Sequence, residues 1–206
     1  MALVVITGGA RSGKSTAAER LALVRQELGA CVIVAVFGHS AHGNDAEFAQ
    51  RIAKHRADRP QAFATLEGAA DVDWLSHVDR DAVLVVDCLG TLLGRVMEDA
   101  WERLAADASL NDADADVLPD RFEEAVAARF DVVVETLLAR LSDTIVVTNE
   151  VGEGIVPAFA TGRLFRDLLG RANRALVDGA DAAYLAVAGR LIDLSALPRE
   201  ASWPQD

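Results

Sequence analysis

Near its start, the chain carries a glycine-rich run that ends in a lysine and a serine. The run consists of Gly8, Gly9, Ala10, Arg11, Ser12, Gly13, Lys14 and Ser15. Glycines let backbone amides turn inward around a phosphate, and a helix that starts here adds its dipole. Lys14 can bridge the outer phosphate oxygens, while the hydroxyl of Ser15 can bind Mg²⁺. The spacing matches the P-loop pattern, so all eight residues are predicted to bind a nucleotide.

The same run could instead be a glycine-rich turn from strand to helix that binds nothing. Its context argues otherwise, because an apolar strand pattern precedes it and an amphipathic helix pattern follows it. A lysine and a serine at the start of a helix serve no packing purpose, whereas anion binding explains both. We therefore expect a nucleotide triphosphate at this loop.

A second candidate for the same chemistry is Asp87, which follows four apolar residues, 83–86. A carboxylate at the end of such a strand is where many P-loop proteins hold the magnesium ion of their nucleotide. Ser15 and Asp87 are therefore the predicted Mg²⁺ ligands. The alternative is that Asp87 only caps the helix that follows it, a role that aspartates often have.

Five short apolar segments, rich in β-branched residues, are typical of strands buried on both faces. They are residues 3–6, 32–36, 83–86, 145–147 and 182–188. Helical patterns lie between them, and this alternation predicts a parallel sheet with right-handed crossovers. The expected fold class is α/β, with a mostly parallel, P-loop NTPase-like (RecA-like) sheet flanked by helices.

Two helices can be placed by their spacing. Residues 14–28 form the first, with Gly29 past its end, and a second follows Pro119. The first is expected to bury Ala17, Leu21, Val24 and Leu28, and the second Phe122, Val126, Phe130, Val133, Leu137 and Leu141.

Composition narrows the possible classes of protein. With 206 residues, 51% hydrophobic and 25% charged, the chain is expected to fold as one domain, 1–206, with a loosely ordered tail at about 197–206. The formal charge of −12 argues against nucleic acid as a partner. No segment is long and apolar enough to span a membrane, and no targeting leader is evident, so the cytoplasm is the expected compartment. Cys31 and Cys88 lie in apolar runs that indicate buried strands, and no disulfide framework is expected.

Three segments together carry a family resemblance. They are the glycine-rich run, residues 51–60 (RIAKHRADRP) and residues 148–157 (TNEVGEGIVP). Residues 163–167, with Gly170 and Asn173, add to it. The chain resembles the bifunctional adenosylcobinamide kinase/adenosylcobinamide-phosphate guanylyltransferase family of cobalamin biosynthesis over nearly its whole length. It departs from the family pattern at residues 35–44 and 90–95.

The resemblance implies an enzyme that phosphorylates the aminopropanol hydroxyl of adenosylcobinamide with ATP or GTP. It then transfers GMP from GTP to that phosphate, which gives adenosyl-GDP-cobinamide. In the family this second step passes through a guanylylated histidine, whose match here is His55. The resemblance also implies a homotrimer.

The chemistry of His55 is consistent with that role. A neutral imidazole can attack the α-phosphorus of GTP and release pyrophosphate. Lys54, Arg56 and Arg59 would place cationic donors near the triphosphate. From the sequence alone, an exposed polar residue at a basic helix end is the favoured interpretation of His55, and the family resemblance reverses that preference.

Further GTP contacts are implied by the resemblance alone. The corresponding positions are Ala35, Val36, Phe37, Arg56, Ala57, Asp58, Arg59, Glu67 and Asp87. Glu67 is suited to guanine, because its carboxylate can accept from the N1 and N2 hydrogens of that base. Capping of a helix N-terminus is the rival role for this residue.

Two other functions remain open at this point. The chain could be a P-loop kinase or nucleotide hydrolase without guanylyl transfer. It could also be a nucleotide-binding protein that switches partners without turnover, by ordering loops around the γ-phosphate.

Overall fold

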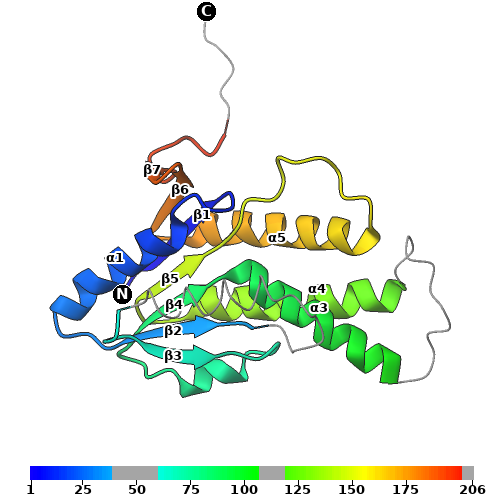
Figure 1. Cartoon of the computed structure of the whole chain (residues 1–206), viewed down its shortest axis with the longest axis horizontal. Helices are drawn as coiled ribbons and strands as arrows, with labels where there is room; N and C mark the ends of the chain where they lie inside the picture. The colour runs from blue at the N-terminus through cyan, green and yellow to red at the C-terminus, as the bar shows by residue number, and fades with distance from the viewer. Residues whose placement is uncertain (39–59, 107–118, 201–206) are drawn as a thin grey trace, which may run out of the picture.

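The computed structural model describes residues 1–38, 60–106 and 119–200 (Figure 1). These residues form a seven-stranded sheet in the order β3-β2-β4-β5-β1-β6-β7. Its strands are β1 (Leu3–Gly8), β2 (Val32–Val36), β3 (Ala64–Glu67), β4 (Val83–Asp87), β5 (Thr144–Val147), β6 (Ala182–Val187) and β7 (Arg190–Asp193). All neighbouring strands are parallel except β6 and β7, which form an antiparallel hairpin. The predicted α/β class with a mostly parallel sheet is confirmed.

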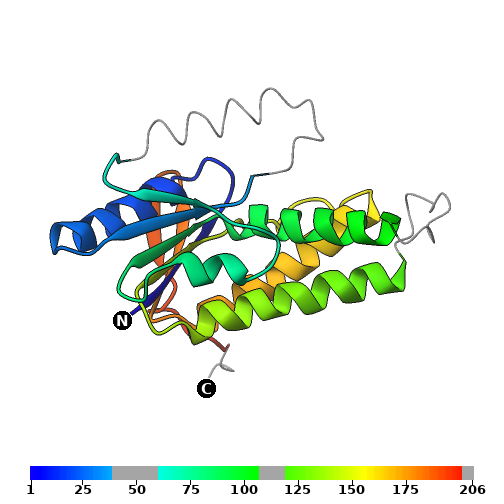
Figure 2. The same ribbon diagram turned by 90° about the horizontal axis from the view of Figure 1, so that it is seen from below.

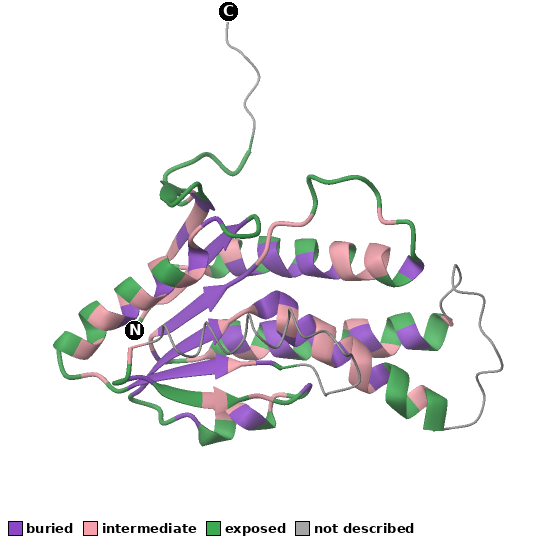
Figure 3. Cartoon of the chain, viewed as in Figure 1, coloured by how far each residue is buried: buried purple, intermediate pink, exposed green. Residues whose placement is uncertain are grey.

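The inner strands are buried on both faces, as their continuous apolar sequences require (Figure 3). The predicted strands all form, although β6 ends at Val187, one residue before the predicted end. The edge strands β3 and β7 are mostly exposed and were not predicted. An edge strand takes its backbone hydrogen bonds from one neighbour and needs no continuous apolar run, so the hydrophobicity pattern does not reveal it.

Helices cover the two faces of the sheet unequally (Figures 1 and 2). Helix α1 (Lys14–Glu27) packs on one face, while α3 (Leu89–Ala106), α4 (Asp120–Ala139) and α5 (Ala160–Gly179) pack on the other. Neighbouring side chains on β1 point to opposite faces of the sheet. Val5 belongs to the core under α3, α4 and α5, whereas Ile6 belongs to the core under α1. A short 3₁₀ helix, η1 (Asp73–His77), connects β3 to β4.

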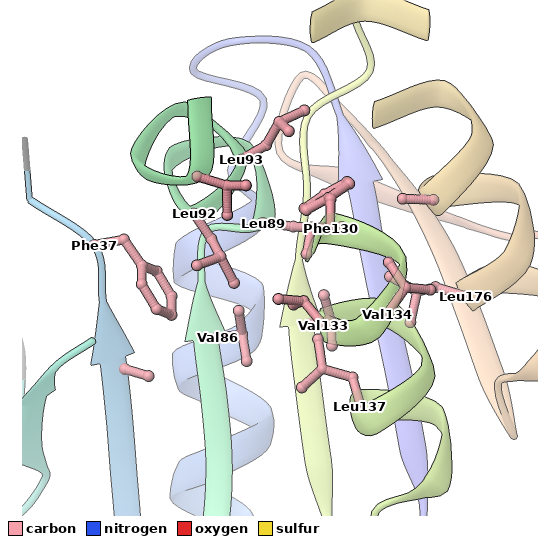
Figure 4. Close-up of a cluster of buried hydrophobic side chains, with 14 of the residues drawn as sticks. Phe37, Val86, Leu89, Leu92, Leu93, Phe130, Val133, Val134, Leu137 and Leu176 are labelled. Carbon is pink, nitrogen blue, oxygen red and sulfur yellow. The ribbon is translucent and has the colours of Figure 1, made fainter. Parts of the chain in front are cut away.

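The larger core fixes the junction between β4 and α3 (Figure 4). Val86 of β4 and Phe37, which follows β2, share this core with Leu89 and Leu92 of α3 and with Phe130 of α4. Leu89 and Leu92 are fully buried, so the first turn of α3 is anchored in the core. As a consequence, Asp87 is held between a buried strand and a buried helical turn.

Helix α1 ends one residue before the predicted end, and Gly29 follows it with a φ of 93°. The predicted apolar face is partly right, because Ala17 and Leu21 pack against the core, whereas Val24 and Leu28 are 55% and 74% exposed. Ala18 and Ala22, which were not predicted to be buried, are the most deeply buried apolar residues of this helix. The small alanine side chains allow the helix backbone to pack close to the strands.

Helix α4 follows Pro119 as predicted, and most of the predicted stripe is buried, at Phe122, Val126, Phe130, Val133 and Leu137. Leu141 is wrongly included in that stripe, because it lies beyond the helix end and is 83% exposed.

Neither cysteine lies inside a buried strand, which corrects the sequence prediction. Cys31 is exposed just ahead of β2, and Cys88 is partly buried just after β4. Both thiols are free, in agreement with the expected lack of a disulfide.

Candidate active site

The glycine-rich run lies at the carboxyl end of β1, between that strand and α1 (Figure 1). Two of its glycines are required by the backbone. Gly8 has a φ of 148°, and a Cβ there would lie 2.4 Å from the carbonyl oxygen of Ala186 on β6. Gly13 has a φ of 98° and precedes the first residue of α1. The run therefore makes the tight turn that a phosphate-binding loop needs.

Lys14 begins α1 and is nearly buried, with 7% of its surface exposed. Its Nζ donates a hydrogen bond to the carbonyl oxygen of Gly9, 2.6 Å away, so the ammonium group lies over the loop. The N-cap residue of α1 is Gly13, whose lack of a side chain leaves the helix start without a side-chain cap. An anion at this position would meet the helix dipole and the lysine together.

The two predicted magnesium ligands lie side by side. The hydroxyl of Ser15 donates a hydrogen bond to Oδ1 of Asp87 over 3.2 Å. At the start of α3, the hydroxyl oxygen of Thr91 accepts a hydrogen bond from the backbone amide of Cys88, the residue before the helix, as in a capping box. Mg²⁺ is typically held by one or two carboxylates, with water and substrate phosphates as its other ligands. The hard oxygen donors of this pair fit such an ion.

No group of three or more His, Cys, Asp or Glu side chains within 1–38, 60–106 and 119–200 is arranged to hold a metal. A magnesium ion at Ser15 and Asp87 would take its further ligands from water and substrate phosphates, as such ions usually do.

The segment that follows β5 is tied to the glycine-rich loop through a buried polar network. Thr148 donates its hydroxyl hydrogen to Oδ1 of Asn173 on α5, 2.6 Å away. Nδ2 of Asn173 donates in turn to the carbonyl oxygen of Asn149 over 2.9 Å. The amide of Glu150 then donates to the carbonyl oxygen of Gly8. Through this network α5 positions the end of β5 against the loop.

Cys88 joins the same network from the side of β4. Its Sγ donates to Oδ1 of Asn149 over 3.3 Å. Burial raises the pKa of the Cys88 thiol above its ordinary value, despite the opposing hydrogen bonds from Thr91. Burial therefore favours the protonated thiol, which acts as a hydrogen-bond donor to Asn149.

The segment 90–95, where the chain departs from the family pattern, forms the start of α3. A Cβ on Gly90 would lie 3.4 Å from Oδ1 of Asn149, so α3 begins directly beside the segment after β5. Sequence reasoning associated Asn149 and Asn173 with the family but did not predict their hydrogen bond to each other.

The strand end at Ala35, Val36 and Phe37 lies two strands away from β5 in the sheet. The side chain of Ala35 is fully buried, and Phe37 is buried with its ring edge-on to Trp74 at a centroid distance of 5.2 Å. Val36 is half-buried. A nucleotide at this strand end could therefore be met only by the Val36 side chain and by backbone atoms.

Glu67 is exposed and ends β3, in register with Val36 of β2. Its rival role as a helix cap is therefore wrong, because no helix starts there. The remaining predicted contacts, His55, Arg56, Ala57, Asp58 and Arg59, lie outside the described residues. None of the helices in the described parts of the chain is long and apolar enough to cross a lipid bilayer.

A hollow of about 360 Å³ adjoins the loop on the side of β6 and β7. Residues from α1 line one side and residues from the β6–β7 hairpin line the other. No sequence pattern predicts this hollow, because its two walls come from opposite ends of the chain.

Comparisons with known proteins point to a single family. The family model described as cobinamide kinase / cobinamide phosphate guanyltransferase matches residues 4–194. The bifunctional adenosylcobalamin biosynthesis protein CobU of Escherichia coli K12 is 32% identical over 189 residues, covering 91% of this chain and 96% of that protein. CobU of Salmonella typhimurium LT2 is 33% identical over 194 residues, covering 91% of this chain and 96% of that protein. The protein CobP of Pseudomonas aeruginosa PAO1, with the same description, is 32% identical over 196 residues, covering 94% and 98%.

Among solved structures, the flagellar accessory protein FlaH from Methanocaldococcus jannaschii aligns with a TM-score of 0.40 and 13% identity, covering 92% of this chain and 74% of that one. A KaiC-like protein from Pyrococcus horikoshii aligns with a TM-score of 0.41 and 16% identity, covering 89% and 70%.

Proposed function

Because the chain belongs to the cobinamide kinase / cobinamide phosphate guanyltransferase family, we propose that it catalyses both reactions of adenosylcobalamin biosynthesis. As a kinase, it phosphorylates adenosylcobinamide with ATP or GTP. As a guanylyltransferase, it transfers GMP from GTP to adenosylcobinamide-phosphate, which gives adenosyl-GDP-cobinamide. The observation that carries the proposal is the cluster of Lys14, Ser15 and Asp87 at the glycine-rich loop, within a chain that matches the family from residue 4 to 194.

In the kinase reaction, an oxygen of the cobinamide hydroxyl attacks the γ-phosphorus of the nucleotide. The bond to the β-phosphate oxygen breaks, the nucleoside diphosphate leaves, and the hydroxyl proton is released. The glycine-rich loop (Gly8, Gly9, Ala10, Arg11, Ser12 and Gly13) holds the phosphates, and the Lys14 ammonium balances charge on the outer oxygens. The rigid junctions at Gly8 and Asp87 support this role, because positioning and charge stabilisation supply most of the catalysis in phosphoryl transfer.

In the guanylyl transfer, the imidazole of His55 attacks the α-phosphorus of GTP and pyrophosphate leaves. An oxygen of adenosylcobinamide-phosphate then attacks the same phosphorus, which releases the histidine. Arg56, Ala57, Asp58 and Arg59 bind this GTP together with the strand end at Ala35, Val36 and Phe37. Glu67 binds the guanine base, which its exposed position at the end of β3 supports.

Mg²⁺ is the cofactor we propose for both nucleotides, held by Ser15 and Asp87. When bound, it would neutralise charge on the phosphate oxygens. The hydrogen bond of Ser15 to Asp87 supports this assignment, because it places both oxygens on one side of the loop.

The Asp87→Asn variant is expected to lower kcat for cobinamide phosphorylation by about 100-fold or more, because it removes the carboxylate charge that attracts the cation. The loss should be partly recovered by raising the Mg²⁺ concentration, which a titration of initial rate against Mg²⁺ measures. Asp81→Asn is the matched control, since Asp81 is exposed just ahead of the same strand, away from its carboxyl end. Equal Mg²⁺ dependence in the Asp87→Asn variant and the wild type would contradict the assignment.

The assembly we propose is a homotrimer in the cytoplasm. Exposed apolar side chains between β5 and α5 support self-association, because Ile155, Val156 and Phe159 are 96%, 62% and 64% exposed. Analytical ultracentrifugation measures the mass of the assembly, and a monomer at micromolar concentration would contradict it.

The proposed function as a whole is tested on the wild-type protein with two labels. Adenosylcobinamide with γ-labelled ATP or GTP should give a labelled corrinoid. With α-labelled GTP and adenosylcobinamide-phosphate, the label should pass to the corrinoid as GMP. Transfer of the γ-label alone would indicate a kinase without guanylyl transfer, and transfer of neither label would refute the proposal.

A further inference from the structure

We propose that the hollow between α1 and the β6–β7 hairpin holds the base and ribose of the nucleotide that phosphorylates cobinamide. This inference rests on the proposed kinase activity and adds a second base site to the guanine site proposed at Glu67. The hollow is lined by Ala17, Arg20 and Leu21 of α1 and by Leu191 of the hairpin, and it meets the loop at Ser12 and Gly189. Its volume of about 360 Å³ falls within the range of small-molecule sites.

The hairpin is attached to the glycine-rich loop. The amide of Gly189 donates to the carbonyl oxygen of Ser12 over 2.9 Å. The backbones also approach closely, because a Cβ on Gly13 would lie 3.3 Å from the Cα of Gly189. The hollow therefore opens directly onto the residues that hold phosphate.

A buried polar group at this opening points to a ligand. Ser12 is only 8% exposed, and its hydroxyl has no hydrogen-bond partner among the described residues. A buried hydroxyl without a partner is costly, so such groups are rare unless a ligand or water completes them. A phosphate or ribose oxygen of a bound nucleotide would supply the missing partner.

The direction of the nucleotide follows from the order of the strands. Asp87 ends β4, which lies on one side of β1 with β5 between them, whereas β6 and β7 lie on the other side (Figure 1). A terminal phosphate beside Ser15 and Asp87 therefore extends the nucleotide away from β4. The nucleoside is carried towards β6 and β7, where the hollow lies.

The lining suits a purine nucleoside. Ala17, Leu21 and Leu191 offer apolar surface to the faces of the base. The side chain of Arg20 is exposed and forms no ion pair with any described residue, so its guanidinium group is available to stack on the base or to bind an oxygen of the ribose.

One nucleotide cannot use both base sites while its phosphates stay at the loop. Glu67 ends β3, which is reached from β1 through β5, β4 and β2. Neighbouring strands are about 4.8 Å apart, so Glu67 lies roughly 19 Å from β1, on the side opposite to β6 and β7. Among the residues that the structure describes, no carboxylate lines the hollow, so the group by which Glu67 would bind guanine is missing there. The two reactions therefore place their bases on opposite sides of a shared phosphate loop.

Leu191→Trp tests this site by filling the hollow, and Ile192→Trp is its matched control. Leu191 and Ile192 are neighbours on β7 with similar exposure, 44% and 46%, and alternation along the strand turns Ile192 away from the hollow. Leu191→Trp is expected to raise KM for ATP in cobinamide phosphorylation about tenfold more than it raises KM for GTP in guanylyl transfer. Ile192→Trp should change neither constant. Equal changes in both constants, or none, in the Leu191→Trp variant would overturn the proposal.

Direct binding separates this inference from the proposed function. Calorimetry of ATP with Mg²⁺, in the absence of corrinoid, should show about tenfold weaker binding to Leu191→Trp than to Ile192→Trp. Arg20→Ala, which adds no bulk, should also weaken ATP binding, and this covers the case in which the tryptophan variant fails to fold. Normal ATP binding by folded Leu191→Trp and by Arg20→Ala would refute the site even if the wild type is a kinase. A wild type that binds ATP at the hollow but phosphorylates no corrinoid would refute only the proposed function.

Discussion

Replacement of Lys14 by alanine is expected to lower kcat for phosphorylation of adenosylcobinamide by about 1,000-fold or more. Lys14 is nearly buried at the start of α1, and its Nζ lies 2.6 Å from the carbonyl oxygen of Gly9. In that position the ammonium group faces the loop that would hold the phosphates, and no water can replace its charge at the moment of transfer. The release of labelled corrinoid phosphate from γ-labelled ATP measures the effect.

Arg174→Ala is the control for this experiment, because it also removes a cation from a helix but at an 87% exposed side chain on α5. It should retain the wild-type rate. Thermal unfolding of Lys14→Ala should show a folded protein, since the substitution leaves a helix-favouring residue at the start of α1. A folded Lys14→Ala protein with more than about one tenth of the wild-type kcat would contradict the role of the loop. Loss of a single electrostatic contact of this kind usually lowers kcat by more than about tenfold.

Replacement of His55 by alanine is expected to remove the covalent GMP label completely, because no other group can form the same phosphoramidate at that position. The wild type, incubated with α-labelled GTP and Mg²⁺, should retain a label that is labile in acid and stable in base, as expected for a phosphorus–nitrogen bond. Phosphorylation of adenosylcobinamide should persist in the His55→Ala variant, since the kinase reaction uses the loop residues. Gel analysis of the labelled chain measures the first effect, and labelled corrinoid the second.

His77→Ala is the matched control for His55→Ala, because His77 is exposed at the end of η1. It should keep the full label. Retention of the label in His55→Ala would exclude this histidine as the acceptor. A wild type without any label would exclude the covalent route.

The parts of the site that could be predicted from the sequence are those coded by contiguous residues. The loop from Gly8 to Ser15 is recognisable because each position has a steric or chemical requirement that only a few residue types meet. Asp87 is predicted as a magnesium ligand because four buried apolar residues precede it in β4. Parallel strands then bring such positions to one edge of the sheet, which is why Ser15 and Asp87 lie close together.

Other features depend on packing that a single stretch of sequence does not record. The hydrogen bond between Thr148 and Asn173 joins residues from a strand end and a helix interior. The buried face of α1 is set by alanines, whose weak hydrophobic signal was outweighed by Val24 and Leu28. The hollow requires β7, an exposed edge strand without an apolar run, to fold back against the loop.

The hydrogen bond from Gly189 to Ser12 also makes the edge of the sheet sensitive to the state of the loop. An edge strand such as β7 ordinarily opens often, and its amides then exchange their hydrogens with solvent. Here the turn of the hairpin can open only by releasing the loop, so any ligand that holds the loop closed must also slow opening of the turn. The amide of Gly189 should therefore report nucleotide binding through its rate of exchange with deuterium, without a corrinoid or a labelled nucleotide. The turn that leads into the outermost strand thus becomes a readout of a site whose chemistry takes place on the other side of β1.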